Sequence, residues 1–276
     1  MKPALIANEE SLHIVIARTI YRWCYAFGVD LRKFLAAVRY FPRVMSEYLT
    51  ARKQAKTLQC AVPFSFSWPC LDDRDQPGGT ATGHYFHQDL LVAKRILARA
   101  PVKHVDVGSR IDGFIAHLAC FRDVDVLDIR PVGARVPRVT FRQWNIVDPP
   151  NDPSELCDSL SCLHAIEHFG LGRYGDAVDL NAHVKAFVNL HKMLTLGGML
   201  YLSVPIGRPR IEFNGGRVLS VETVLAWCRN RFALVSFSYV DDVGDLHESV
   251  DLNERIIKET SVMRYGCGIF ELRKTA

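Results

Sequence analysis

Residues 101–131, PVKHVDVGSRIDGFIAHLACFRDVDVLDIRP, decide the fold of this chain. An apolar run predicts a strand that ends at Asp106, a glycine turn follows at Gly108, and a helical pattern leads to a second strand that ends at Asp128. In such a unit the turn brings the backbone close to a nucleotide-containing cofactor, and an acid about 20 residues later binds the ribose hydroxyls. The stretch therefore predicts a cofactor pocket.

Strands and helices keep alternating after this unit. Apolar, β-prone runs predict strands at 139–144, 156–163, 199–204, 232–240 and 268–272. Helices are predicted at 186–196, which Gly197-Gly198 would close, at 220–228, and at 247–259, where we expect only a packing role. About seven strands with helices between the first five predict an α/β fold with a mostly parallel sheet covered on both faces.

The composition excludes several classes of protein. With 276 residues, 49% hydrophobic and 23% charged, the chain is typical of a globular protein. A net charge of +4 is too small to demand a nucleic-acid partner, and we predict none. Eight scattered cysteines without a Cys-x-x-Cys pair favour a reducing cytosol over a disulfide framework. We predict neither a signal peptide nor a membrane span, since Arg18 and Arg22 interrupt the apolar stretch at 11–28.

The N-terminal part differs in charge from the rest. Residues 1–56 carry ten Lys and Arg against four acids. We predict a basic helical region at 1–58, in which Pro42 ends or kinks a helix, an irregular Pro/Gly/aromatic connection at 59–83, and a Rossmann-like domain at 84–276. The basic helices either pack on the core with a solvated face or lie on an anionic membrane surface or a phosphate-bearing lipid.

The segment GHYFHQD at 83–89 opens a helical pattern that leads into the first strand. A helix in this position places its first side chains near the cofactor end of the sheet, so His84, Tyr85 and His87 are candidate site residues. The alternative is that Gln88 or Asp89 simply starts the helix and the histidines are exposed.

Five segments carry a resemblance to a known family. The core resembles class I S-adenosylmethionine-dependent methyltransferases over about residues 84–207, with the successive strand ends of that family in order. These segments are HVDVGSRIDGF, VLDIRP, VTFRQWNIVDPP, LSCLHAIEH and LHKMLTLGGMLYLSVP. The wording GHYFHQDLLVAKRI, IEHFGLGRYGD and RIEFNGGRV more closely resembles DUF268, a bacterial family often met in surface-polysaccharide gene clusters.

The resemblance implies S-adenosylmethionine as cofactor and assigns its contacts. Asp106 and Gly108 would face its methionine part, Asp128 would take both ribose hydroxyls, and Asn145 would receive the adenine amino group. The strand end at 161–164, with His164, would lie beside the sulfonium. The glycine turn is longer than usual, and its Arg110 would hold the cofactor's carboxylate or a substrate phosphate. The expected cofactor-binding residues are Asp106, Gly108, Ser109, Arg110, Asp128, Asn145, His164 and Tyr85.

The loop EHFGLGRYGD at 167–176 is the expected place for chemistry. The sequence His164-Ala-Ile-Glu167-His168, which overlaps the start of this loop, matches the H-x-x-E-H motif of inverted zinc proteases. It follows a strand directly and runs into glycines rather than a helix, which argues against a zinc protease. Methyl transfer to a hydroxyl needs alignment and a base for the proton. We predict His168 as that base, with Glu167 or Asp176 orienting or replacing it.

Two alternatives stay open at this loop. His168 would bond only to the backbone if another group were the base. A metal-assisted reaction with Mg²⁺ on Glu167, His168 and Asp176 is a second option, although the spacing does not require it and we assign no metal ligands.

The acceptor residues follow from the cations and aromatics around the loop and in GRPRIEFNGGRV at 207–218. The candidates are His87, Arg173, Tyr174, Arg210, Glu212 and Asn214. We expect O-methylation of a sugar or glycan, free or lipid-linked, in surface-polysaccharide assembly. The protein is expected in the cytoplasm, and if its basic helices bind the membrane, it is peripheral to the inner membrane. The rivals are a non-methylating sugar-modifying enzyme on the same fold and a non-catalytic scaffold of the assembly machinery.

Overall fold

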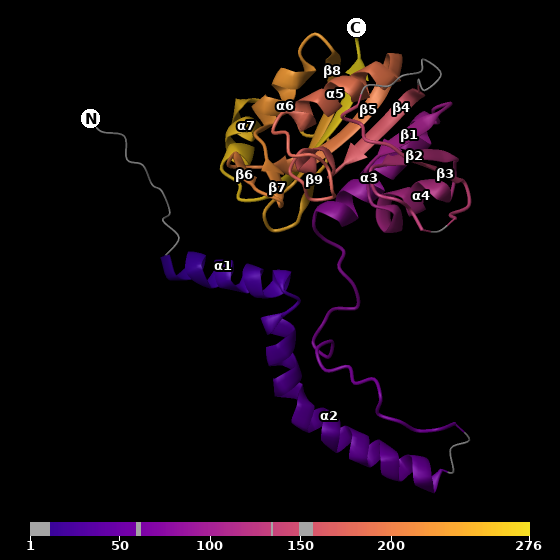
Figure 1. Ribbon diagram of the computed structural model, residues 1–276, viewed down its shortest axis with the longest axis vertical. Coiled ribbons are helices and arrows are strands. Elements are labelled where there is room, and N and C mark those ends of the chain that lie inside the picture. Colours follow the sequence, from indigo (N-terminus) through magenta and orange to yellow (C-terminus); the bar gives the residue numbers. More distant parts are fainter. Residues whose placement is uncertain (1–11, 59–61, 134, 149–156) are drawn as a thin grey trace. The chain divides into compact units, whose positions relative to one another are not determined.

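The computed structural model describes residues 12–58, 62–133, 135–148 and 157–276. The chain divides into two units, a helical unit at Met1–Gly79 and a core unit at Thr80–Ala276 (Figure 1). The core unit thus begins before the predicted boundary at residue 84, and most of the expected connection at 59–83 belongs to the helical unit.

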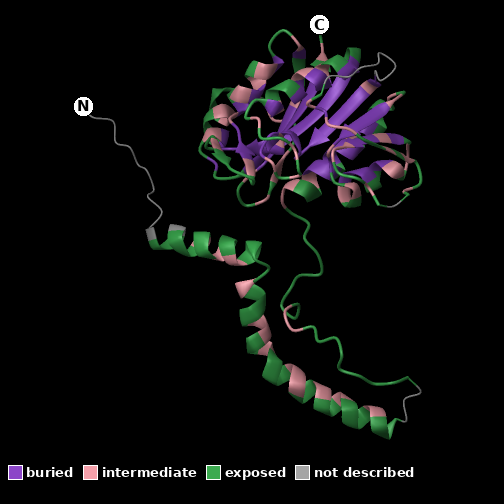
Figure 2. Ribbon diagram, viewed as in Figure 1, coloured by how far each residue is buried: buried purple, intermediate pink, exposed green. Residues whose placement is uncertain are grey.

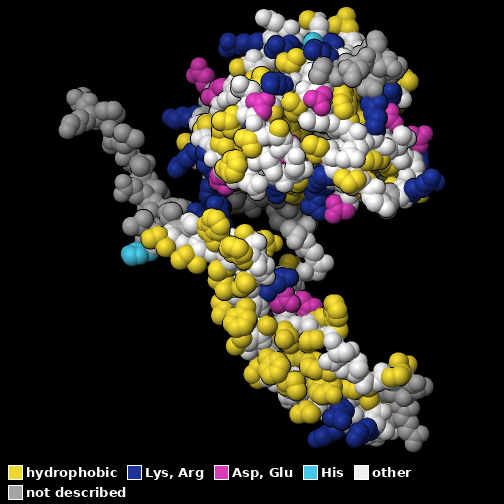
Figure 3. Space-filling view, viewed as in Figure 1, with side chains coloured by type: hydrophobic (Ala, Val, Ile, Leu, Met, Phe, Trp, Pro, Cys, Tyr) yellow, Lys and Arg dark blue, Asp and Glu magenta, His cyan; other side chains and the backbone are white. Residues whose placement is uncertain are grey.

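The helical unit contains two helices, α1 (Leu12–Ala26) and α2 (Leu31–Thr57). The Asp30 side chain starts α2 by accepting the backbone N–H groups of Arg32 and Lys33. Pro42 lies inside α2, so the helix does not end there, and it bends along its length (Figure 1). None of its described residues is buried, and apolar side chains run along both helices (Figure 3).

The segment after α2 lies along that helix. The ring of Tyr48 stacks on Phe64 with centroids 5.7 Å apart and contacts Phe66 at 4.8 Å. Lys33 pairs with Asp72 at 3.5 Å. Among the described residues, no helix is both long and apolar enough to cross a lipid bilayer. Binding of the basic helices to a membrane surface stays a prediction.

The core unit is built on an eight-stranded sheet in the order β3-β2-β1-β4-β5-β10-β8-β9. β1 to β5 pair in parallel, whereas β10 is antiparallel to both neighbours. Seven strands were predicted, and the eighth, β9, is a two-residue edge strand. The strands are β1 (His104–Val107), β2 (Val124–Asp128), β3 (Val139–Gln143), β4 (Cys157–Leu163), β5 (Leu194–Ile206), β8 (Phe232–Val240), β9 (Leu246–His247) and β10 (Gly266–Lys274).

Helices cover both faces of the sheet (Figure 1). One face carries α3 (His84–Arg99), the π-helix η1 (Ile111–Ile115) and α4 (Ala116–Ala119), and the other carries α5 (Ala182–Met193), α6 (Val221–Cys228) and α7 (Glu254–Ser261). β5 feeds both cores, because Leu200 and Leu202 pack on the α5 side while Met199 and Tyr201 pack on the α3 side. The strands are the most buried part of the unit (Figure 2). This confirms the predicted Rossmann-like class I methyltransferase fold.

Three local predictions were wrong in detail. The helix expected at 186–196 is α5, which ends at Met193, and Gly197 lies inside β5 with a φ of +81°. The register against β4 slips there, so the glycine pair makes a bulge rather than a helix end. The helix expected at 247–259 begins only at Glu254, where the Asn253 side chain accepts the N–H of Ile256. The loop expected at 207–218 contains a hairpin of β6 (Arg210–Glu212) and β7 (Gly216–Val218).

Candidate functional site

A cavity of about 200 Å³ lies at the carboxyl ends of the parallel strands β1 to β4. Ligands of open α/β sheets bind at this edge, because loops from neighbouring strands diverge there. The lining residues are Val107, Gly108, Leu127, Asp128, Ile129, Arg130, Trp144, Asn145, Ile146, Val147, Asp148, His164, Ala165, His168, Phe169, Gly170, Tyr174, Asp176, Ala177, Asp179 and Ala182.

The floor of this pocket is held by the buried carboxylate of Asp106. It accepts the backbone N–H of Ser109 at 3.0 Å and the hydroxyls of Ser109 and Ser161 at 2.6 and 2.5 Å. Burial raises the pKa of Asp106 to about 6, although the hydroxyl and N–H donors oppose this. Since these hydrogen bonds join Asp106 to other parts of the chain, its role here is to shape the Gly108 turn rather than to line the cavity.

Gly108 allows a close approach at that turn. Its φ is +73°, and a Cβ at this position would lie 3.0 Å from the Cβ of Ala165. A side chain here would therefore be strained and would fill the space between β1 and the end of β4. The half-buried turn after β1 lines the cavity together with Val107, the last residue of that strand.

Asp128 ends β2 at the pocket wall and is engaged by Arg130. The guanidinium donates from Nε to Oδ1 at 3.0 Å and from Nη2 to Oδ2 at 2.6 Å. The Arg130 cation also lies 4.3 Å from the centroid of the Tyr174 ring. Both oxygens predicted to bind ribose are thus held by a neighbouring side chain that is about half exposed.

The third strand end supplies a polar amide beside apolar surface. The Oδ1 of Asn145 accepts the N–H of Val147 at 3.1 Å, which fixes the amide at the pocket wall. Trp144, Ile146 and Phe169 provide the apolar lining around it. This combination suits a flat, partly polar ring system.

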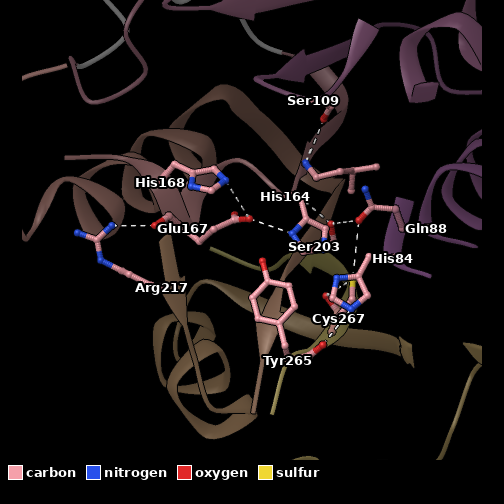
Figure 4. A network of polar contacts seen from close by, with 12 residues as sticks. His84, Gln88, Ser109, His164, Glu167, His168, Ser203, Arg217, Tyr265 and Cys267 are labelled. Carbon is pink, nitrogen blue, oxygen red and sulfur yellow. Dashed lines mark hydrogen bonds and ion pairs between the residues drawn. The ribbon is translucent and has the colours of Figure 1, made fainter. Parts of the chain in front are cut away.

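His164 follows β4 in a strained backbone conformation. Its φ is +48°, which a non-glycine residue adopts rarely, and Ser203 fixes it by accepting its N–H at both the carbonyl and the hydroxyl oxygen. Its Nδ1 lies 2.9 Å from Oε1 of Glu167 (Figure 4). Burial disfavours a charged ring, but Cys267 and Glu167 outweigh it and raise the pKa of His164 above its ordinary value.

His168 also lines the pocket but has a different environment. An Nη1 of Arg173 lies 3.2 Å from its Nδ1, and Oε1 of Glu167 lies 3.6 Å from its Nε2. Burial lowers the pKa of His168, Glu167 opposes that effect, and the Arg173 cation adds to it. The ring is therefore neutral at neutral pH, and it lies beside Glu167 rather than bonding only to the backbone.

The loop at 167–176 is clamped from beneath by a buried cation. Arg217 of β7 is 2% exposed and donates to the carbonyls of Glu167 at 3.0 Å, Phe169 at 2.8 Å and Leu180 at 3.3 Å. The carboxylate of Asp176 accepts the N–H groups of Gly170 and Tyr174 and closes the loop on itself. Asp176 thus stabilises the loop through backbone N–H groups rather than through His168.

The predicted site residues fall into three groups. Those at the pocket are Gly108, Asp128, Asn145, His164, His168, Tyr174 and Asp176. Those beneath or beside the pocket are Asp106, Ser109, Glu167, Arg173, Tyr85 and Arg110. In this group, Arg110 pairs with Asp112 at 2.8 Å and lies over the Tyr85 ring. Those away from the lining are His87 on α3 and the hairpin residues Arg210, Glu212 and Asn214. Arg210 donates to the carboxylate of Glu212 at 2.9 Å and to nearby backbone carbonyls. Its guanidinium is therefore engaged by groups of the chain itself.

Sequence reasoning missed Arg130 and Asp179 as lining residues. Arg130 stands two residues after the predicted ribose acid, which is the signal that could have found it. Asp179 lies in the turn that precedes α5, and this turn places it in the pocket wall. The sequence pattern around Asp179 does not indicate that position.

The residues suggested for Mg²⁺ do not form a metal site among the described residues. Oε1 of Glu167 is taken by His164, and both oxygens of Asp176 accept backbone N–H groups. Within the described ranges, the one set of side chains arranged to hold a metal ion is His84, His164 and Cys267.

Acidic side chains dominate the pocket charge. Four aspartates, Asp128, Asp148, Asp176 and Asp179, line it together with a single arginine. A cavity with an excess of carboxylates attracts a cationic ligand and repels a phosphate.

Comparisons with known proteins agree with the fold. Residues 145–275 match the model of a family described as Caenorhabditis protein of unknown function, DUF268. That description gives no support to the bacterial surface-polysaccharide context. A search of curated protein sequences gives no match.

The solved structures that resemble the chain include the [4+2]-cyclase SpnF, which is 14% identical over 69% of this chain and 80% of its own, with a TM-score of 0.50. They also include the N-methyltransferase NodS from Bradyrhizobium japonicum WM9 with S-adenosyl-L-homocysteine, 17% identical over 74% and 94%, with a TM-score of 0.48. A third is 1,6-didemethyltoxoflavin-N1-methyltransferase from Burkholderia thailandensis with S-adenosylhomocysteine, 12% identical over 87% and 91%, with a TM-score of 0.47. At 14% identity, the likeness to SpnF shows the fold alone.

Proposed function

We propose that the core unit is an S-adenosylmethionine-dependent methyltransferase. The observation that carries this proposal is the convergence of four consecutive strand ends on one acidic cavity, with the Gly108 turn, Asp128 and Asn145 on its wall. The two methyltransferases named above were solved with S-adenosylhomocysteine, which supports the same cofactor class for this fold.

The residues present fit that cofactor. The Gly108 turn leaves the space that a Cβ would fill, Asp128 offers two oxygens to a ribose diol, and Asn145 offers an amide to an adenine edge. The carboxylate excess also suits a sulfonium cation and a free amino group. Arg130 competes with a diol for Asp128, because its guanidinium donates to both carboxylate oxygens.

The bound cofactor supplies the electrophilic methyl group, and the chain supplies alignment and proton transfer. His168 lies at the pocket as a neutral imidazole, with Oε1 of Glu167 3.6 Å from its Nε2. When Arg173 withdraws from Nδ1, that nitrogen can accept the hydroxyl proton. Arg217 and Asp176 keep the loop in place for this step.

The first prediction concerns ribose binding. Asp128→Asn should weaken S-adenosylhomocysteine binding about 10- to 100-fold, because a charge-assisted pair of hydrogen bonds worth about 1.5–3 kcal/mol is lost. Titration calorimetry on the full chain measures this. Asp125→Asn, on the same strand but outside the lining, is the matched control and should keep the wild-type affinity.

Absence of binding of either S-adenosylmethionine or S-adenosylhomocysteine to the wild-type chain would overturn the proposed function. Equal affinity in Asp128→Asn and wild type would remove only the ribose assignment.

The second prediction concerns Arg130. Arg130→Met should tighten S-adenosylhomocysteine binding about two- to fivefold, because the ion pair that competes for Asp128, worth up to about 1 kcal/mol at a half-exposed position, is removed. The gain should be larger for cationic S-adenosylmethionine, since the pocket becomes more negative. Weaker binding of both molecules in the same calorimeter would mean that Arg130 contacts the ligand instead.

The third prediction concerns the proton acceptor. Arg173→Gln should raise the pKa of His168, because a cation 3.2 Å from its ring no longer opposes protonation. Imidazole proton resonances followed by NMR against pH measure the shift, and His168→Gln identifies the signal. Arg210→Gln on the neighbouring hairpin is the control. A base works above its pKa, so the acidic limb of a pH–rate profile should move to higher pH in Arg173→Gln.

We also propose a sugar or glycan hydroxyl as the methyl acceptor, on the strength of the resemblance described above. The full chain should release S-adenosylhomocysteine when S-adenosylmethionine is supplied with nucleotide-activated or lipid-linked sugars, and the rate should fall at least about tenfold in His168→Gln. Release with none of these sugars, in a chain that binds the cofactor, would reject this acceptor class and leave the cofactor assignment intact.

A further inference from the structure

Three ligand-type side chains that are distant in sequence meet beside the pocket. His84 begins α3, His164 follows β4, and Cys267 lies near the start of β10. One ligand atom from each lies within 4.8 Å of the other two, and Figure 4 shows the two rings and the sulfur gathered at this place. Cys267 is fully buried and His164 is 7% exposed.

Neighbouring acceptors fix the tautomers of both histidines. Nδ1 of His164 lies 2.9 Å from the Glu167 carboxylate, so in the neutral ring that a metal requires, Nδ1 carries the proton and Nε2 has the lone pair. Nε2 of His84 lies 3.1 Å from the carbonyl of Tyr265, which only accepts, so the lone pair of His84 is on Nδ1. A histidine that binds a metal donates its other N–H to a carboxylate or a carbonyl in this way.

The atoms left for a ligand are poorly satisfied within the chain. Nε2 of His164 is buried and has no hydrogen-bond partner in the structure. The sulfur of Cys267 has long contacts, 3.8 Å to Oε1 of Gln88 and 4.0 Å to the carbonyl of Gly268, and it interacts with the His164 ring, whose pKa it raises. A buried unpartnered nitrogen destabilises the folded chain, and the strained φ of His164 adds to that cost. A bound ion would satisfy the nitrogen and the sulfur together.

We infer that His84, His164 and Cys267 bind a divalent transition metal ion of the zinc class through two imidazoles and one thiolate. Zinc prefers nitrogen and sulfur in tetrahedral sites with ligand atoms about 3.3–3.6 Å apart. Binding an ion would therefore draw these ligand atoms together and rotate at least one of the two imidazoles, which now stack at an angle of 9°. Three protein ligands leave one position for water or another small ligand. Glu167 orients His164, which also lines the pocket, so the metal site adjoins the pocket.

The test uses the full chain, stripped with a chelator and titrated with Co²⁺ as a spectroscopic stand-in for Zn²⁺. We expect one equivalent to bind with a sulfur-to-cobalt charge-transfer band that added Zn²⁺ removes. Cys267→Ser should abolish the band, whereas Cys228→Ser, which removes a buried thiol on α6, should keep it. Glu167→Gln should weaken binding about 10- to 100-fold, as the loss of a carboxylate behind a metal-bound histidine does.

Failure of the folded wild-type chain to bind one equivalent of Co²⁺ would overturn the site, as would a band that persists in Cys267→Ser or disappears equally in Cys228→Ser. If Cys267→Ser does not fold by circular dichroism, His84→Gln replaces it, since His84 is only partly buried and its loss should also weaken binding at least about tenfold. S-adenosylhomocysteine binding measured on the same samples reports the proposed methyltransferase separately, because the metal ligands do not include Gly108, Asp128 or Asn145.

Discussion

The carboxylate of Asp106 is the interaction on which the pocket depends. It joins β1 to β4 through the Ser161 hydroxyl and shapes the turn after β1 through both donors of Ser109. The Ser109 hydroxyl in turn accepts the N–H of Leu163, so the ends of the two central strands are fixed to one another. Buried networks of this kind hold one geometry when every member is satisfied, and they are costly when one is not. These hydrogen bonds therefore also fix the position of the Gly108 turn.

The same strand pair explains a buried histidine below the site. His104 of β1 lies 2.8 Å from the Ser159 hydroxyl and 3.0 Å from that of Ser161, and burial lowers its pKa to about 3. Because this pKa lies below the ordinary value, the folded state favours the neutral ring. The contribution of His104 to folding stability is therefore present above about pH 6.5 and is lost as the pH falls toward 3. Because the His104 ring is neutral, Asp106 is the charged member of this network whenever its carboxyl group is deprotonated.

The sequence was sufficient for the strand-end residues and insufficient for what surrounds them. Gly108, Asp128 and Asn145 follow strands directly, and parallel strands end at one edge, so their meeting at the pocket was predictable. The pairing of Asp128 with Arg130 was not predictable, because an arginine two residues after an aspartate can face solvent equally well. Arg217 was seen only as a cation in a loop, whereas the hairpin buries it under the Glu167 loop. Cys267 and His84 come together only through the antiparallel pairing of β10 with β5, which periodicity does not specify.

His164 shows how the end of β4 serves two purposes with one strained residue. A φ of +48° costs about 1–3 kcal/mol, and the two bonds from its N–H to Ser203 keep the residue in that conformation. The strained turn sets Ala165 against Gly108, which shapes the pocket, and turns the His164 ring toward His84 and Cys267. A relaxed backbone at this position would displace both features together. The strain is therefore tied to the geometry of the strand end as a whole.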